Sequence, residues 1–383
     1  MAKVLILTES IGGNGHLLAA RSIGKALKQL DSTVEIKLLN GLSLVSRHLE
    51  NTIRHAYIQT LRIAPQLWGQ AYNQERKWST LFQMPLGAVI ANYLQEAIKR
   101  EDPDVVVCTH AFCLSAAAKL KKNGSYRLGA AITDFDVNGF WMHEEVDFYI
   151  VAHEDIGAKI DKDGYSHAVI VTTGIPIDPL YSEVCKQSRQ HMRQKLGLHQ
   201  SQPTLLMMGG GLGLGPIDRM IGKLVDNFIN DVQIIVVTGR NEALQKRCKQ
   251  LYGSHSNIHV LGYVEALAYY VAAADFIVTK PGGLTSSEAL AMGLPIIVTN
   301  PIPGQEERNS RFLLRHRVAL RVNNPHDVSR YVRPFIDDAN FYEQFSGRAR
   351  RVGKPESAKH AAALILDMID RTNKRSPHHV VYE

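Results

Sequence analysis

Short runs of valine, isoleucine and leucine alternate along this chain with helical segments, and this alternation narrows the possible folds more than any other feature. The first series, KVLILT, VEIKLL, DVVVCT, LGAAIT, FYIVA and HAVIVTT, lies within residues 3–173. Continuous apolar runs bounded by turn residues are typical of strands buried on both faces of a parallel sheet. A second series, TLLMMGG, QIIVVTG, NIHVLG, DFIVT and PIIVT, lies within residues 204–299. Two successive series of this kind predict two Rossmann-like α/β domains.

The length of the chain agrees with two domains, because 383 residues exceed the size that a single hydrophobic core usually reaches. Residues 172–203, between the two series, contain close prolines followed by a basic helical pattern. We therefore expect an N-terminal domain at 1–179 and a C-terminal domain at 180–355. Residues 356–383 are expected to form an amphipathic helix followed by a flexible tail.

Composition limits the compartment and the partners. The formal net charge of +7 favours attraction to an anionic surface, whether nucleic acid, a phosphorylated ligand or acidic lipid. The four cysteines form no CxxC pair and no zinc-site spacing, which favours reduced thiols in the cytoplasm. The first residues, MAKVLIL, are interpreted as a strand rather than a signal peptide. No run approaches the roughly 18 to 20 uncharged apolar residues of a membrane span, so any membrane contact is expected to be peripheral.

Two glycine clusters each follow the first strand of a series, at residues 12–15 (GGNG) and 209–215 (GGGLGLG). Neither cluster fits GxGxxG, and the next strands end in Asn40 and Arg240 rather than in an acidic residue. This pattern disfavours a nicotinamide cofactor. The absence of GxxxxGK[ST] likewise disfavours a P-loop NTPase.

The stretch TKPGGLTSSEALAMGLPIIVTN at residues 279–300 combines a strand, two glycines and a helical pattern. Backbone N–H groups exposed at such a helix start bind a diphosphate, and the helix dipole adds favourable potential for negative charge. Glu288, in the first turn, is placed to accept hydrogen bonds from the two hydroxyls of a ribose. The alternative is a structural one, in which Thr285 and Glu288 form a capping box and nothing more.

A second polar loop, PGQEERN at residues 303–309, follows the next strand. Its side chains lie at the carboxyl end of a buried sheet, where ligands of open α/β sheets bind. The amide of Gln305 and the carboxylate of Glu306 are the groups that sugar hydroxyls require, so this loop favours a sugar site.

Residues 44–97 interrupt the alternation with a long helical, basic and aromatic region. A basic and aromatic amphipathic surface is typical of contact with a lipid interface. The alternative is that these helices pack their aromatic residues, Tyr57 among them, on the domain core. The residues assigned to the membrane face are Arg54, Arg62, Trp68, Arg76, Lys77 and Trp78.

Taken in order, GGNGH, ITDFDVNGFWMHEEVD, TTGIPIDP, MGGGLG and the stretch at 279–309 resemble the glycosyltransferase family of monogalactosyldiacylglycerol synthases and processive diacylglycerol glucosyltransferases. That family is related to the peptidoglycan lipid II synthase. The resemblance covers nearly the whole chain. It implies a GT-B fold with an N-terminal acceptor domain, a C-terminal nucleotide-sugar domain, a cleft between them, and a last helix that returns to the first domain.

The resemblance also implies roles for individual residues. His16 matches the histidine held to be the general base, for which an imidazole pKa near 6.5 is suitable; its alternative roles are capping the helix or touching the donor phosphate. The implied acceptor or phosphate loop residues are Gly12, Gly13, Gly15, Asp134 and Trp141. The implied donor-binding residues are Gly209, Gly210, Gly211, Arg240, Gly262, Tyr263, Val264, Gly283, Leu284, Thr285, Glu288, Gln305 and Glu306. Transfer would invert the anomeric carbon, with the leaving diphosphate stabilised by the helix start rather than by a metal.

Two positions depart from the family pattern, and one motif is misleading. In the lipid enzymes a histidine is expected near the position of Asn138, and its absence here leaves the identity of the acceptor open. Arg308 is expected to alter the rim of the sugar pocket. Asp134-Phe135-Asp136 mimics a DxD metal motif but falls in the acceptor domain. We therefore expect no metal and no cofactor.

The function expected from the sequence is transfer of a hexose from a UDP-sugar to diacylglycerol or a related lipid. The enzyme is expected to be cytoplasmic and peripheral on the inner face of the cell membrane, with an anionic membrane surface as partner and no nucleic acid. One alternative is a different hydrophobic or polyprenyl-linked acceptor, which Asn138 favours. The other is a catalytically idle nucleotide-sugar-binding membrane protein.

Overall fold

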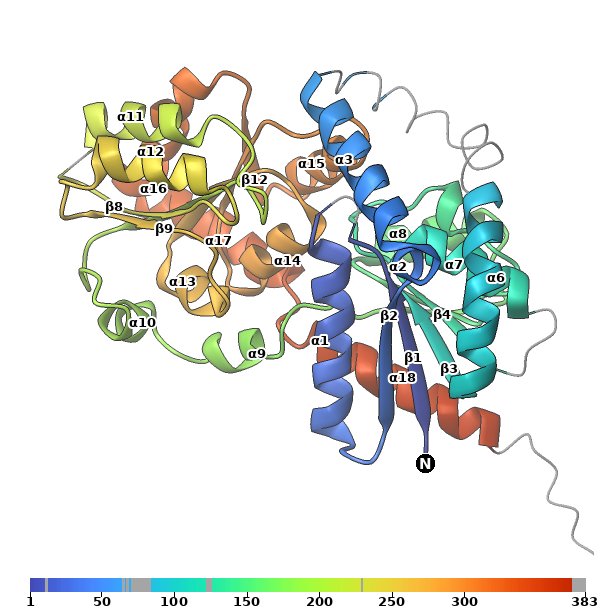
Figure 1. Ribbon diagram of the computed structural model, residues 1–383. Helices are drawn as coiled ribbons and strands as arrows, with labels where there is room; N and C mark the ends of the chain where they lie inside the picture. Colours follow the sequence, from blue (N-terminus) through green and yellow to red (C-terminus); the bar gives the residue numbers. More distant parts are fainter. Residues whose placement is uncertain are drawn as a thin grey trace, which may run out of the picture.

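The computed structural model of the chain describes residues 1–10, 13–63, 66, 69, 84–121, 126–228 and 230–373. Among the residues singled out above, Gly12, Trp68, Arg76, Lys77 and Trp78 lie outside this described part, as does the expected tail. Arg62 lies within a helix, but its side chain is not described. Figure 1 shows two α/β units side by side, with the N-terminal unit on the right.

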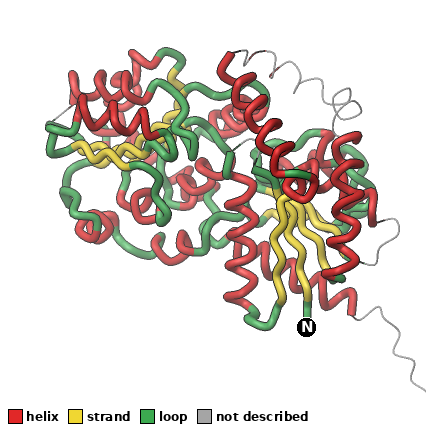
Figure 2. The backbone as a smooth tube through the Cα atoms, in the orientation of Figure 1, coloured by secondary structure: helices red, strands yellow, loops and turns green. Residues whose placement is uncertain are grey.

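The N-terminal unit is built on a parallel six-stranded sheet in the order β2-β1-β3-β4-β5-β6. Its strands are β1 (Lys3–Thr8), β2 (Glu35–Asn40), β3 (Val105–Cys108), β4 (Arg127–Ala131), β5 (Phe148–Val151) and β6 (Val169–Thr172). Its helices are α1 (Gly15–Leu30), α2 (Gly41–Val45), α3 (Arg47–Ile63), α6 (Met84–Glu101), α7 (Ala111–Lys121), the short η2 (Gly139–Trp141) and α8 (Glu154–Lys162). Every residue of the central strands β3 and β5 is buried, as their uninterrupted apolar sequences predict. Figure 2 shows these strands flanked by helices.

The C-terminal unit has a second parallel sheet, in the order β12-β11-β10-β7-β8-β9. Its strands are β7 (Thr204–Met208), β8 (Gln233–Val237), β9 (Ile258–Leu261), β10 (Phe276–Thr279), β11 (Ile296–Thr299) and β12 (Ala319–Val322). Two short helices, α9 (Leu180–Val184) and α10 (Arg189–Lys195), connect the two sheets. The helices that follow β7 are α11 (Ile217–Phe228), α12 (Glu242–Tyr252), α13 (Leu267–Ala273), α14 (Gly283–Ala291), α15 (Gln305–Arg315), η3 (Pro325–Asp327), α16 (Val328–Asp337), α17 (Ala339–Val352) and α18 (Ser357–Asn373). Strand β7 pairs with both β8 and β10, so the strand order reverses beside the loop after β7.

The edge strand β12 was not predicted from the sequence. Its sequence, ALRV, is only partly buried and carries a charged residue, so it lacks the continuous apolar run that marks the other strands. The charge of Arg321 is paired with Glu307 of α15, at a distance of 2.6 Å.

Helix α18 packs on the N-terminal unit, although it follows the whole C-terminal unit in sequence. Its residues Ala358, Ala361 and Ile365 belong to one buried cluster with Val4 and Ile6 of β1. In Figure 1 α18 crosses behind β1 and β3, beside α1. The expected return of the last helix, and with it the GT-B arrangement of two Rossmann-like domains, is therefore confirmed.

Helix α15 also links the C-terminal unit to the N-terminal unit. Asn309 donates to Asp134 Oδ1 at 3.0 Å and accepts from the backbone N–H of Phe135 at 2.8 Å. The ring of Phe312 stacks on that of Phe135, with 4.7 Å between centroids. These contacts hold the two domains together around the loops that follow their strands.

Candidate active site

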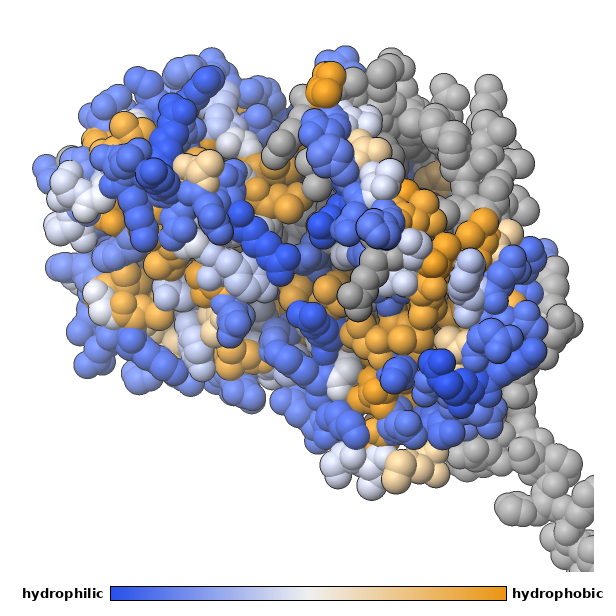
Figure 3. All heavy atoms as spheres, viewed as in Figure 1, coloured by the Kyte–Doolittle hydropathy of each residue, from blue (hydrophilic) through white to orange (hydrophobic). Residues whose placement is uncertain are grey.

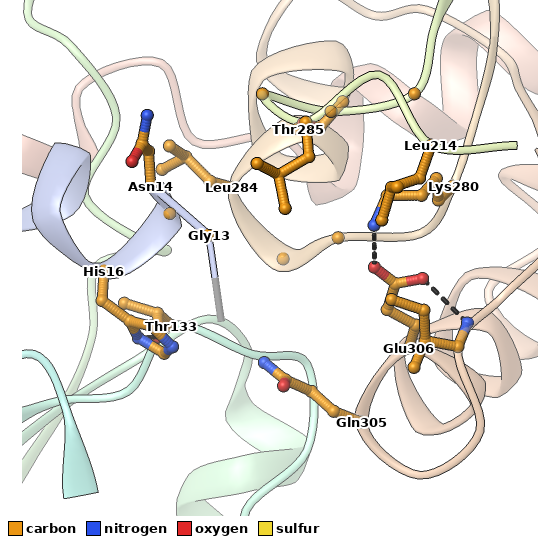
Figure 4. A pocket seen from close by; sticks show the side chains of 18 of the residues that line it. Gly13, Asn14, His16, Thr133, Leu214, Lys280, Leu284, Thr285, Gln305 and Glu306 are labelled. Carbon is orange, nitrogen blue, oxygen red and sulfur yellow. Dashed lines mark hydrogen bonds and ion pairs between the residues drawn. The ribbon is translucent and has the colours of Figure 1, made fainter. Parts of the chain in front are cut away.

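Two adjoining cavities lie between the domains, at the carboxyl ends of the strands. The first, here called the histidine cavity, has a volume of about 140 Å³ and is lined by His16 and Thr133 from the N-terminal domain and by Lys280, Gln305 and Glu306 from the C-terminal domain. Figure 4 shows these side chains converging from the two domains. The second, here called the Glu288 cavity, has a volume of about 410 Å³. Both cavities share the 210–211 and 284–285 segments, so they form one continuous cleft.

His16 lies in the first turn of α1, where one backbone oxygen and one side-chain oxygen fix its ring. Its Nδ1 is 2.9 Å from the Thr109 carbonyl oxygen and 2.7 Å from Thr133 Oγ1. Because a carbonyl oxygen can only accept, Nδ1 carries the ring hydrogen of the neutral imidazole, and Nε2 is left as the acceptor. The expected alternative in which His16 merely caps α1 is wrong, since the N-cap is Asn14 and makes no side-chain capping bond.

The neutral form of His16 is favoured by its surroundings. Burial lowers the pKa of His16, while the charge of Asp134 and the bond to Thr109 partly oppose this shift. The ring of His110 meets that of His16 edge-on, with 4.7 Å between centroids. His16 is thus an imidazole able to take up a proton at Nε2.

The start of α14 forms an anion-binding surface on the opposite wall. The N-cap is Gly282, which provides no side-chain capping bond, so the capping box of Thr285 and Glu288 expected as an alternative is wrong. A Cβ at Gly283 would lie 2.0 Å from the Thr133 carbonyl oxygen, so a glycine is required at this close approach of the two domains. The first N–H groups of a helix have no partner within it, and the residues that carry them here, Gly283, Leu284 and Thr285, line the cavity at the positive end of the helix dipole.

Two further groups complete this anion-binding surface. Lys280 lines the histidine cavity, and its Nζ lies 2.6 Å from Glu306 Oε1. The 209–215 loop turns back on itself through bonds from Gly213 N to Gly210 O and from Leu214 N to Gly209 O, both 3.0 Å long. Positive φ angles of 69° at Gly210 and 56° at Gly213 make that turn possible. The expected Gly209, Gly210 and Gly211 all line the cavity.

Glu288 projects from α14 into the second cavity. Burial raises the pKa of Glu288 to about 8, an effect that the Tyr181 hydroxyl partly offsets. Tyr263 and Val264, both expected from the sequence, line the same cavity. The cavity is therefore lined by a carboxyl group as well as by an aromatic and an aliphatic side chain.

Glu306 and Gln305 reach the histidine cavity, but both are also bonded to protein groups. Glu306 Oε2 accepts from the Ile302 backbone N–H at 2.9 Å, in addition to the ion pair with Lys280. Gln305 Nε2 lies 2.7 Å from both carboxylate oxygens of Asp134. These bonds fix the orientation of both side chains before any ligand is bound.

Several residues expected at the site lie elsewhere. Asp134 is buried behind the cavity and accepts from Gln305 and Asn309, so it positions neighbours rather than lining the cavity. Trp141 is a core residue of η2, 5% exposed, whose carbonyl accepts from Tyr149. Arg240 is exposed and stacks its guanidinium over the Tyr263 ring at 5.2 Å. Gly262 lines neither cavity and lies against the Gln245 side chain.

The departures from the family pattern also have structural explanations. Arg308 does not line the histidine cavity but pairs with Asp136 at 3.2 Å across the domain interface. Asp136 also pairs with Lys159 at 2.9 Å. Asn138 is 5% exposed and its side chain caps η2 by accepting from Phe140 N.

Sequence reasoning missed several residues of the histidine cavity, among them Tyr57, Thr133 and Lys280. A signal for Lys280 was present, because a cation directly before a glycine-rich helix start is a phosphate-binding pattern. Thr133 and Tyr57 gave no such signal, since each reaches the cavity only through contacts between distant segments.

Comparison with known proteins agrees with this geometry. The family model described as monogalactosyldiacylglycerol (MGDG) synthase matches residues 16–177, and the one described as glycosyl transferases group 1 matches residues 188–352. These two matches, one in each domain, identify the chain as a glycosyltransferase. The first match includes His16, and the second includes α14 and α15, so each wall of the cleft falls in one of the two family regions.

Curated relatives of this glycosyltransferase extend over almost its full length. A processive diacylglycerol beta-glucosyltransferase of Bacillus pumilus is 28% identical, over 96% of this chain and 94% of the relative. A protein of the same name from Bacillus cereus is 29% identical, over 99% of this chain and 96% of the relative.

Solved structures show the same fold at low sequence identity. MurG of Acinetobacter baumannii has a TM-score of 0.63 at 14% identity, and the likeness covers 96% of this chain and 100% of that one. A UDP-GlcNAc 2-epimerase of Neisseria meningitidis, bound to UDP-GlcNAc, has a TM-score of 0.60 at 15% identity and the same coverage. Among the helices that the structure describes in our glycosyltransferase, none is both long and apolar enough to cross a bilayer.

Proposed function

We propose that this glycosyltransferase moves a hexose from a UDP-sugar to diacylglycerol or a related membrane lipid, with inversion at the anomeric carbon. The observation that carries the proposal is the placement of His16, whose Nε2 is a proton acceptor, in the same cavity as the start of α14 and Lys280. A base and an anion-binding surface on opposite walls are what an in-line displacement at a sugar carbon requires.

In this reaction the acceptor hydroxyl oxygen attacks the anomeric carbon as its proton passes to His16 Nε2. The bond from the anomeric carbon to the diphosphate oxygen breaks, and UDP leaves with the electron pair. The N–H groups at the α14 start and the Lys280 ammonium stabilise the negative charge on the leaving diphosphate, so we propose no metal. Glu288 accepts hydrogen bonds from the ribose hydroxyls, and Tyr263 and Val264 flank the uracil ring.

The sugar would occupy the part of the histidine cavity bounded by Gln305 and Glu306. Each carboxylate oxygen has more than one acceptor site, so Glu306 can accept from sugar hydroxyls while it keeps its bonds to Lys280 and Ile302. The relatives named as diacylglycerol glucosyltransferases support a glucosyl donor and a diacylglycerol acceptor. Asn138 no longer favours another acceptor, because its side chain caps η2.

The acceptor would be presented at the inner face of the cell membrane, with the enzyme bound peripherally. Figure 3 shows hydrophobic side chains gathered on the N-terminal domain around α2 and α6, and Val89 and Tyr93 of α6 are exposed. Arg54 is exposed on α3, from which it can meet anionic headgroups.

The test is incubation of purified protein with UDP-glucose, UDP-galactose or UDP-N-acetylglucosamine and diacylglycerol micelles, with lipid products read by mass spectrometry. A hexosyl lipid that is absent with His16→Ala is the expected result. Binding of UDP-sugar without any glycolipid would overturn the lipid acceptor. Binding without even slow, His16-dependent donor hydrolysis would favour the idle nucleotide-sugar-binding protein instead.

A further inference from the structure

Helix α3, from the segment inserted between β2 and β3, contributes a side chain to the histidine cavity. That side chain is Tyr57, which lines the cavity together with Thr133, Gln305 and Glu306. The remaining lining residues come from loops that follow strands or from helix starts. Tyr57 is therefore the point at which the inserted segment meets the reacting groups.

One face of α3 is fixed against the N-terminal domain. Leu49, Ile53 and Tyr57, spaced four residues apart, all pack against the buried core, whereas Arg54 is exposed on the other face. Glu50, in the first turn, accepts from Ser10 Oγ at 2.7 Å. A helix held in this way presents Tyr57 to the cavity in a fixed position.

The surroundings of Tyr57 favour the protonated phenol. Burial and the nearby carboxylates of Glu306 and Asp134 raise the pKa of Tyr57, so its hydroxyl is a hydrogen-bond donor throughout the neutral range. The chain beyond α3 also contacts the sugar side of the cleft, since a Cβ at Gly69 would lie 2.6 Å from the Pro303 side chain. The inserted segment thus abuts the loop that carries Gln305 and Glu306.

We propose that Tyr57 is a specificity-determining residue that contacts the transferred sugar opposite Glu306. The proposal rests on the proposed function, because it places the sugar in the histidine cavity. A phenol donor on one side and a carboxylate acceptor on the other distinguish sugars that differ in the direction of one hydroxyl, since the wrong epimer leaves a buried polar group without its partner. Selection of the donor sugar is therefore shared between the C-terminal domain and a helix of the acceptor domain.

The experiment compares Tyr57→Phe, Tyr57→Ala and the control Tyr126→Phe. Tyr126 is also buried, and its hydroxyl donates to the Ala117 carbonyl at 2.7 Å, away from both cavities. We would measure kcat and KM with UDP-glucose and UDP-galactose, together with UDP affinity by calorimetry and the melting temperature of each variant.

We expect Tyr57→Phe to lower kcat/KM for the preferred donor by about tenfold, as one buried hydrogen bond predicts. The preference between the two epimers should shrink, while UDP affinity should be unchanged because Tyr57 does not line the Glu288 cavity, where we place the uridine. Tyr57→Ala should reduce the preference further. Unchanged kinetics in Tyr57→Phe, or equal losses in Tyr57→Phe and Tyr126→Phe, would overturn the role of Tyr57. Absence of glycolipid with the unsubstituted protein would instead overturn the proposed function.

Discussion

The chemistry of His16 depends on residues far away in sequence. The Thr109 carbonyl fixes the ring hydrogen at Nδ1, and Thr133, in the loop after β4, contacts the same nitrogen. The glycine-rich loop with its histidine could be recognised in the sequence, but the protonation state of the ring could not. It follows from the placement of one carbonyl and one carboxylate by tertiary structure.

His16→Ala should lower kcat by about 10²- to 10⁴-fold, the usual contribution of a general base. UDP affinity should stay unchanged, because His16 does not line the Glu288 cavity. Steady-state kinetics and calorimetry would check both values. A parallel loss of UDP affinity would indicate that His16 touches the donor phosphate instead.

The pH dependence of kcat, measured with saturating UDP-sugar so that the titration of Glu288 does not enter, should reflect the lowered pKa of His16. A base must be neutral to accept a proton, so activity should fall only below pH 6.5, the ordinary imidazole value. Asp134 stabilises the imidazolium, and Asp134→Asn should therefore move this acid limb to still lower pH. A limb that moves to higher pH in the variant would contradict the assignment.

Glu288 should make UDP binding pH-dependent in the same direction as His16 makes activity, but over a higher pH range. Its pKa is about 8, and ribose hydroxyls donate to the ionised form, so UDP affinity should rise about tenfold between pH 7 and pH 9 as the carboxyl loses its proton. Calorimetry across this range would measure the effect. Glu288→Gln should bind UDP weakly with no such rise, and an identical rise in that variant would exclude Glu288 as its source.

Among the elements, most of the parallel strands were predictable, but the contribution of α3 to the cavity was not. Continuous apolar runs identify buried strands in a sequence. The edge strand β12 contains a charged residue and was therefore not predicted. The start of α14 was expected near Thr285 but lies at Gly283. Tyr57 was expected either at a membrane surface or in the core, and it packs on the core while also reaching the cavity.

Two adjacent glycines at the α14 start provide a matched test of domain closure. Gly283→Ala would place a Cβ 2.0 Å from the Thr133 carbonyl oxygen, whereas a Cβ at Gly282 meets no atom within 4 Å. The first substitution should push the domains apart, at a cost of about 1–3 kcal/mol to the closed form, and lower kcat. Small-angle scattering should show a larger radius of gyration for Gly283→Ala than for Gly282→Ala. Equal radii and equal rates would argue against this contact as a limit on closure.

For the whole molecule, the stability of the N-terminal domain should depend on α18. Ile365 is fully buried against β1, and Ile365→Ala should lower the free energy of unfolding by about 2–5 kcal/mol in urea. Lys359→Ala, on the exposed face of the same helix, should change it by less than about 0.5 kcal/mol. Similar losses in the two variants would mean that α18 contributes through its helicity rather than through packing.

Membrane association should depend on charge at α3. Arg54→Gln should weaken binding to vesicles rich in anionic lipid by about fivefold at low salt, and added salt should reduce the difference. Lys246→Gln, which removes the same charge from the exposed face of α12, should have no effect. Cosedimentation would measure both, and equal binding by both variants would remove α3 from the membrane face.

The return of α18 to the first domain has a consequence for how the chain is made. The core that contains β1 also needs Ala361 and Ile365, which leave the ribosome only after the entire nucleotide-sugar domain has been synthesised. The first domain to be translated is thus the last to be completed, and a nascent chain that stalls early displays an apolar sheet face for chaperones to shield.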